Sequence, residues 1–111
     1  MAERIRKAIE SHPFKLIDET VLHKTCSIGF ASFPFLPDHP MELSWEQVID
    51  VADHALYAAK KSGRNRSVGL AANAATAEEM LHRRLVSNLK ELVENNEVNV
   101  ISEKPDDLIW D

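Results

Sequence analysis

Four basic side chains, Lys60, Lys61, Arg64 and Arg66, lie within seven residues and surround a Ser-Gly pair. Lysine supplies a point charge and arginine a planar fork of donors, so Lys60 and Arg64 could together hold a polyphosphate across Gly63. A plainer interpretation is that cations gather in the last turn of a helix, where each stabilises the helix dipole by about 0.3–1 kcal/mol. No glycine-rich phosphate loop accompanies the cluster, which excludes a P-loop. The spacing alone leaves both interpretations open.

The segment before the basic cluster carries a clear helix signal. Ser44 and Gln47 form a capping box at its start. Gly63 is the expected C′ residue, because a left-handed backbone costs glycine little. We therefore expect a helix over 45–62, followed by a short strand over 65–70. The apolar stripe that predicts this helix consists of Trp45, Val48, Ile49, Ala52, Ala55, Leu56 and Ala59.

The first part of the chain predicts a helix and then two strands. Apolar residues at helical spacing start at Ala2, and His12-Pro13 ends the helix because the residue before proline is pushed out of the helical region. The two strands lie within 14–33, with a turn or loose hairpin between them. The second covers 24–31, with Cys26, Ile28 and Phe30 on one face and Thr25, Ser27, Gly29 and Ala31 on the other.

The small second face of this strand predicts a close approach, by a packed helix or, as the less favoured alternative, by a ligand. Three prolines within 34–40 then predict an extended surface loop. In the last third, Thr76 and Glu79 form a second capping box, which predicts an amphipathic helix ending at Asn95-Asn96. The final residues predict a short strand and an anchoring Trp110.

Composition limits the classes of function. A chain of 111 residues is long enough for one domain, and its 18 acidic against 13 basic residues argue against general binding of nucleic acid or of anionic membranes. A single cysteine, Cys26, permits no intrachain disulfide and fits a reducing cytosol. No apolar run has the length of a membrane helix. His23 and Cys26 are the nearest pair of metal ligands, and without two more we expect no metal site there.

Three stretches, "AERIRKAIE", "TCSIGFASFP" and "ADHALYAAKKSGRNR", resemble in this order the second half of the GGDEF domain of diguanylate cyclases. The third stretch is the specific one. The resemblance covers residues 1 to about 70 and leaves a tail, 71–111, unassigned. The residues that match the third motif are Ala52, Asp53, Ala55, Leu56, Tyr57, Ala59, Lys60, Gly63, Arg64 and Asn65.

The resemblance implies an α/β (α+β) fold: a partial ferredoxin-like, nucleotidyl-cyclase-like GGDEF domain that lacks its N-terminal strands and carries a C-terminal helix. In that family two domains meet, each with a bound GTP, and each 3′-hydroxyl attacks the other's α-phosphate to make cyclic di-GMP with Mg²⁺ or Mn²⁺. Lys60 and Arg64 match the pair that holds the GTP phosphates. Arg4 matches an arginine that contacts cyclic di-GMP at an inhibitory site. Structural roles follow for the motif residues Ser27, Gly29, Asp53, Tyr57, Gly63 and Asn65.

The signature Gly-Gly-[Asp/Glu]-Glu-Phe is absent, because the three glycines Gly29, Gly63 and Gly69 are nowhere adjacent. The family's metal-binding aspartate and guanine-reading residues would precede Met1, so we expect a piece of a longer domain that binds no metal by its own residues and makes no cyclic di-GMP alone. We also expect a homodimer or domain swap, because the missing strands leave apolar surface under-covered. The expected location is the bacterial cytoplasm, at the end of a larger sensor protein.

Two other classes of function stay open. One is a non-catalytic module derived from this family, which senses nucleotide or binds a partner protein. The other is a small nucleic-acid binder that uses "KKSGRNR", which the acidic total and the lack of interleaved aromatic residues disfavour.

Overall fold

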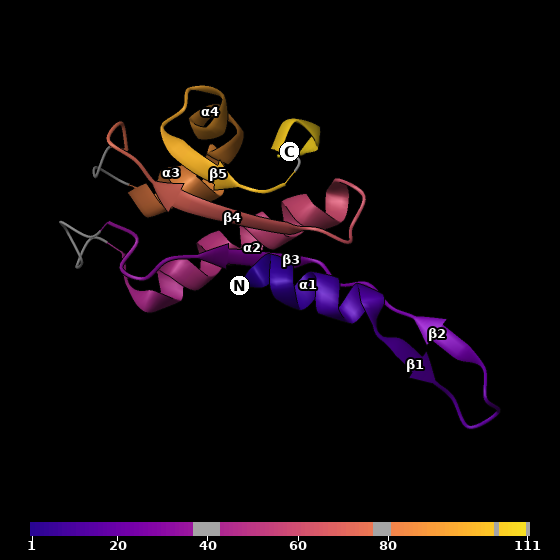
Figure 1. Cartoon of the computed structure of the whole chain (residues 1–111). Coiled ribbons are helices and arrows are strands. Elements are labelled where there is room, and N and C mark those ends of the chain that lie inside the picture. The colour runs from indigo at the N-terminus through magenta and orange to yellow at the C-terminus, as the bar shows by residue number, and fades with distance from the viewer. Residues whose placement is uncertain (37–42, 77–80, 104, 111) are drawn as a thin grey trace.

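A computed structural model describes residues 1–36, 43–76, 81–103 and 105–110 of the chain. It confirms a mixed α+β fold (Figure 1). The elements in chain order are α1 (Ala2–Ser11), β1 (Pro13–Lys15), β2 (Val21–His23), β3 (Ile28–Ala31), α2 (Trp45–Lys61), β4 (Ser67–Ala72), α3 (Leu81–Ser87), α4 (Leu89–Glu94), β5 (Val98–Ile101) and the 3₁₀ turn η1 (Pro105–Asp107).

The central sheet has the strand order β3-β4-β5. β3 and β4 are parallel, with Ile28 opposite Ser67, and α2 forms the crossover between them. β5 runs antiparallel to β4, with Gly69 opposite Ile101. The expected C-terminal strand is therefore present, and the tail continues the same sheet. Within the described residues β3 pairs on one side only, so its outer edge is open.

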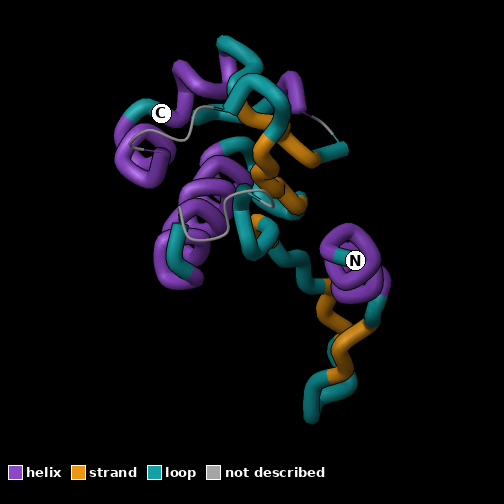
Figure 2. Tube along the Cα trace, turned by 90° about the vertical axis from the view of Figure 1, so that its left-hand side faces the viewer, coloured by secondary structure: helices purple, strands orange, loops and turns teal. Residues whose placement is uncertain are grey.

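The two longest described helices, α1 and α2, lie on opposite sides of this sheet, as Figure 2 shows. α2 presses on β3 at Gly29, where an added Cβ would lie 2.3 Å from the carbonyl oxygen of Ala52. This contact confirms that a packed helix occupies the small face of the strand. The strand begins at Ile28 and not at Lys24, because β4 offers no pairing residue before Ser67.

The core lies between the sheet and the helices α2, α3 and α4. Two residues of the predicted apolar stripe, Trp45 and Ile49, are 59% and 49% exposed, whereas Val51 and Ala58 are buried in their place. The helical period was correct, but the buried side of α2 is narrower and centred elsewhere. The buried apolar residues are Phe35, Leu36, Leu43, Val48, Val51, Ala55, Ala58, Ala59, Val68, Leu70, Leu81, Leu85, Leu89, Leu92 and Val98.

The proline-rich segment differs from a simple surface loop at its start, since Phe35 and Leu36 are buried beside Pro34. Its other two prolines, Pro37 and Pro40, lie outside the described residues.

Where the structure describes the expected helix over 76–95, from residue 81 onward, it forms two helices, α3 and α4, that meet at Asn88. This residue has φ −128° and ψ 32°, outside the helical region, although its N–H still donates to the carbonyl of Arg84. Asparagine favours such breaks because its short side chain competes with helical hydrogen bonds. The second capping box includes Glu79, which lies outside the described residues. The Thr76 hydroxyl donates to the carbonyl of Glu97.

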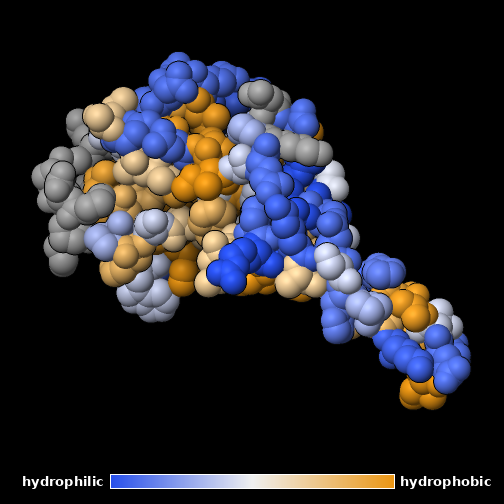
Figure 3. All heavy atoms as spheres, viewed as in Figure 1, coloured by the Kyte–Doolittle hydropathy of each residue, from blue (hydrophilic) through white to orange (hydrophobic). Residues whose placement is uncertain are grey.

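The hairpin of β1 and β2 forms a separate two-stranded sheet that projects from the body of the molecule (Figures 1 and 3). Its tip carries the fully exposed Ile17. None of the described helices has the length and apolar content needed to cross a membrane.

Candidate functional site: a basic turn after helix α2

The C-terminus of α2 continues into three consecutive residues with left-handed backbone. Gly63 has φ 108°, Arg64 has φ 61° and Asn65 has φ 50°. The amide of Arg64 donates to the carbonyl of Ala59 at 3.0 Å, which is the long-range bond of a Schellman C-cap. Gly63 thus occupies the predicted C′ position. The turn reverses the chain from the last turn of α2, which carries Lys60, toward β4.

The four cations of this turn differ in their surroundings. Lys61 Nζ lies 5.2 Å from the ring centroid of Tyr57, a cation–π contact. Arg66 is half-buried, and its guanidinium nitrogen Nη1 is buried without a hydrogen-bond partner among the described residues. Lys60 and Arg64 are exposed, and neither side chain has an ion-pair or hydrogen-bond partner within the described part of the chain. Lys60 and Arg64, the two residues for which the resemblance implies phosphate binding, are therefore both exposed and without a partner among the described residues.

Sequence reasoning missed the group of side chains that supports this turn from α1. Arg6 is only 8% exposed and contacts Glu3, Glu10 and Asn65. Glu3, Arg6 and Glu10 follow one another at intervals of three and four residues, which places them on one face of α1. An arginine flanked by two glutamates on one helical stripe was the available signal, and it indicates a buried charge that needs partners.

The other motif residues lie apart from the basic turn. Arg4 is exposed on α1, Ser27 is half-buried just before β3, and Gly29 packs against α2. Asp53 and Tyr57 line a separate pocket.

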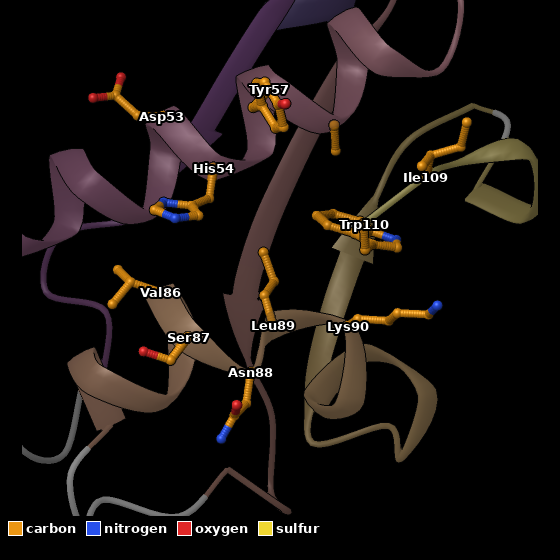
Figure 4. A pocket seen from close by; sticks show the side chains of 11 residues that line it. Asp53, His54, Tyr57, Val86, Ser87, Asn88, Leu89, Lys90, Ile109 and Trp110 are labelled. Carbon is orange, nitrogen blue, oxygen red and sulfur yellow. The ribbon is translucent and has the colours of Figure 1, made fainter.

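This pocket has a volume of about 520 Å³ and lies between α2, the junction of α3 and α4, and the C-terminal segment (Figure 4). Tyr57 and His54 come from α2, and Trp110 comes from the opposite wall. The amide of Ile109 donates to the Ser62 hydroxyl at 2.7 Å, which holds that wall against the end of α2. The anchoring role expected for Trp110 agrees with its packing against the core.

The metal ion that the GGDEF resemblance implies would need oxygen ligands such as carboxylates. No cluster of three His, Cys, Asp or Glu side chains suited to a metal ion occurs within the described residues. The described residues therefore do not fit a Mg²⁺ or Mn²⁺ site.

Comparison with known proteins gives the family. The family model "Diguanylate cyclase, GGDEF domain" matches residues 1–66, more than half of the chain. The chain belongs to this GGDEF domain family. The match ends at the basic turn, so the whole of Lys60 to Arg66 lies within it.

Several diguanylate cyclases are similar to this GGDEF segment. Diguanylate cyclase DosC of Escherichia coli K12 is 42% identical over 65 residues, which cover 59% of this chain and 13% of the relative. Diguanylate cyclase A of Treponema denticola is 39% identical over 66 residues, covering 60% and 16%. The probable diguanylate cyclase DgcF of Escherichia coli K12 is 44% identical over 71 residues, covering 60% and 21%. The chain thus spans about a fifth or less of each relative, and no solved structure matches it significantly.

Proposed function

We propose that Lys60 and Arg64 hold the phosphates of GTP in a diguanylate cyclase domain whose C-terminal half is residues 1 to about 70. One observation carries this proposal. The two cations at the motif positions are exposed and unpaired within the described residues, and a left-handed turn fixes the backbone between them. Lys60 acts as a point charge and Arg64 as a two-pronged donor toward adjacent phosphate oxygens.

The electrostatics of the helix end make these two side chains decisive. A helix C-terminus carries about half a negative charge, which repels a phosphate. Unlike a phosphate loop, this turn therefore has no favourable dipole to add to the attraction. Binding should depend almost wholly on the two cations, which is a testable consequence.

In the proposed domain the pair serves phosphoryl transfer. The 3′-hydroxyl of one GTP attacks the α-phosphate of the other, pyrophosphate leaves, and the reaction repeated in the opposite sense closes cyclic di-GMP. Lys60 and Arg64 orient the triphosphate and neutralise its charge. We propose that the protein acts in the bacterial cytoplasm as part of a larger sensor, and that Arg4 contacts cyclic di-GMP at an inhibitory site.

We do not expect this chain by itself to complete the reaction. The metal ion of the family would need carboxylates that the described residues do not supply. Incubation of the pure chain with GTP and Mg²⁺ should give no cyclic di-GMP by liquid chromatography. Detectable product would contradict this expectation.

A second copy is the proposed partner, as a homodimer or a domain swap. The outer edge of β3 is open within the described residues, and Phe33, Trp45 and Ile49 expose apolar surface. Open strand edges and apolar patches favour association. Sedimentation velocity should show a dimer at micromolar concentration, and a monomer throughout would contradict the proposal.

Calorimetric titration of GTP into the chain and three variants tests the phosphate site. Lys60→Met and Arg64→Met should each weaken binding about tenfold, the order expected for one charge-assisted contact. Lys61→Met is the matched control, because it removes the same charge one residue away but from a side chain held over Tyr57. Equal losses in all three variants would indicate a non-specific charge effect and contradict the proposal.

The alternative function is a non-catalytic module that binds nucleotide or a partner protein. The described residues contain no metal-binding cluster, which is compatible with this module and with a piece of a cyclase domain alike. An upstream reading frame that encodes Gly-Gly-[Asp/Glu]-Glu-Phe would support the cyclase domain. A stop codon directly before Met1 would support the non-catalytic module.

A further inference from the structure

The basic turn contains a backbone conformation that its own sequence does not favour. Arg64 and Asn65 both have positive φ, at 61° and 50°. Asparagine tolerates this region, but a long side chain such as arginine is disfavoured there. Two such residues in succession persist only where the surrounding structure holds them. The question is therefore which contacts hold this turn.

The cap bond from the Arg64 amide to the Ala59 carbonyl holds the start of the turn, and the contacts that hold Asn65 come from Arg6 of α1, 59 residues away in the sequence. Arg6 Nη1 donates to the side-chain oxygen of Asn65 at 2.9 Å and to its carbonyl oxygen at 3.4 Å. The Asn65 side-chain amide in turn donates to Glu10. One asparagine thus has its side chain held on both sides by α1, while its backbone stays left-handed.

Arg6 is itself fixed in place. Its Nε donates to both carboxylate oxygens of Glu3, at 2.8 and 3.0 Å, and Glu3 also accepts from the hydroxyl of Ser67 at 2.5 Å. Glu10 and Glu103 lie 3.5 and 3.9 Å from the guanidinium. Since Arg6 and Ser67 are almost fully buried, this network has little freedom to rearrange.

We infer that Arg6 is a positioning residue for the phosphate site: through Asn65 it holds the left-handed turn that places Arg64 beside Lys60. This inference rests on the proposed function of Lys60 and Arg64, and it adds a residue that the phosphate never touches. Glu3 and Glu10 complete the device by orienting Arg6 and Asn65. Arg6 of α1 therefore sets the geometry of a turn that lies 59 residues later in the sequence.

The first arm of the test measures the turn without any ligand. The HN–Hα coupling constants and the Cα chemical shifts of Arg64 and Asn65 report φ in the labelled chain. In Arg6→Met, and equally in Arg6→Lys, which keeps the charge but lacks the fork, these values should move away from the left-handed range. Unchanged values in both variants would overturn the inference, whatever the chain binds.

The second arm measures affinity for inorganic tripolyphosphate in the folded variants. If the turn keeps its left-handed conformation in only about one fifth of the molecules, the apparent affinity for tripolyphosphate falls about fivefold. Asn65→Gly is the second variant, for the case in which the Arg6 variants do not fold. Glycine adopts the left-handed φ readily, so this variant loses only the side-chain contacts of Asn65. It should also weaken binding about fivefold. Lys15→Met, on the distant hairpin, is the charge-matched control and should bind as the original chain does.

The outcomes separate the two proposals. If Arg6 only stabilises the fold, its variants will unfold at lower temperature but keep the coupling constants and the tripolyphosphate affinity, and the inference fails. If Lys60→Met and Arg64→Met bind tripolyphosphate as tightly as the original chain, the proposed phosphate site fails. In that case the coupling constants still decide whether Arg6 holds the turn.

Discussion

The contact between Gly29 and α2 should be the least tolerant point of the scaffold that carries the basic turn. A Cβ at Gly29 would lie 2.3 Å from the Ala52 carbonyl oxygen and 2.3 Å from the Leu56 amide nitrogen. An unstrained contact needs about 3.5 Å, so α2 would have to move by about 1 Å. Both neighbours are helix backbone and cannot rotate away. Gly29→Ala should therefore displace the helix that ends in Lys60.

The expected change in the free energy of unfolding for Gly29→Ala is the balance of two opposing effects. Overpacking in a filled core costs about 1–3 kcal/mol, and a clash with backbone belongs at or above the upper end. Replacing glycine by alanine restricts the unfolded chain and returns about 0.5–1 kcal/mol. The net loss is about 2–3 kcal/mol, a large part of the roughly 5–15 kcal/mol that stabilises a domain of this size.

Urea unfolding followed by tryptophan fluorescence measures this loss. With a slope of about 1–1.5 kcal/mol per molar urea, the midpoint should fall by about 2 M. Gly69→Ala is the matched control, because its added Cβ would meet the ring of Phe30, a side chain that can turn aside. It should cost about 1 kcal/mol or less. Equal midpoints for Gly29→Ala and the original chain would refute the packing described here.

Three further predictions concern the helix cap, the tail and the charged network. Ser44→Ala removes the hydroxyl that accepts from the Gln47 amide and should lower stability by about 1 kcal/mol; an unchanged melting temperature would contradict this. Leu85→Ala should cost about 3 kcal/mol in one cooperative transition, because Leu85 is 1% exposed in the shared core, whereas two separate transitions would show an independent tail. The hydrogen bonds from Arg6 lower the pKa of Glu3 from 4.5 to about 2. The stabilisation of the fold by the Glu3–Arg6 pair should therefore be complete above pH 4.5 and be lost as the pH falls toward 2. Urea unfolding across this range checks it, and Glu3→Gln should lose that pH dependence.

The parts of the fold that could be predicted from the sequence are those with local causes. The capping box of Ser44 and Gln47 has both of its hydrogen bonds, and Gly63 has the left-handed φ of a C′ residue. Each signal involves residues within one or two turns of each other. Local geometry therefore determines them without reference to the rest of the chain.

The features that could not be predicted depend on which distant segments meet. Helical periodicity located α2, but it could not show that Trp45 and Ile49 would stay uncovered. The break at Asn88 reflects how α3 and α4 each pack on the core.

The candidate site divides in the same way. The motif around Lys60 and Arg64 was visible as a spacing of basic residues around a glycine. The grip of Arg6 on Asn65 spans 59 residues and was visible only once the fold brought α1 beside the turn. The sequence pattern showed which side chains carry charge, and the structure showed that Arg6 contacts Asn65, the residue after Arg64.

The most direct test of the phosphate site is a titration of the isotope-labelled chain with GTP, followed by amide chemical shifts. The largest shifts should fall on residues 60–65, and tripolyphosphate should reproduce them. Shifts centred on the pocket between Tyr57 and Trp110, or no shifts at millimolar GTP, would contradict this prediction.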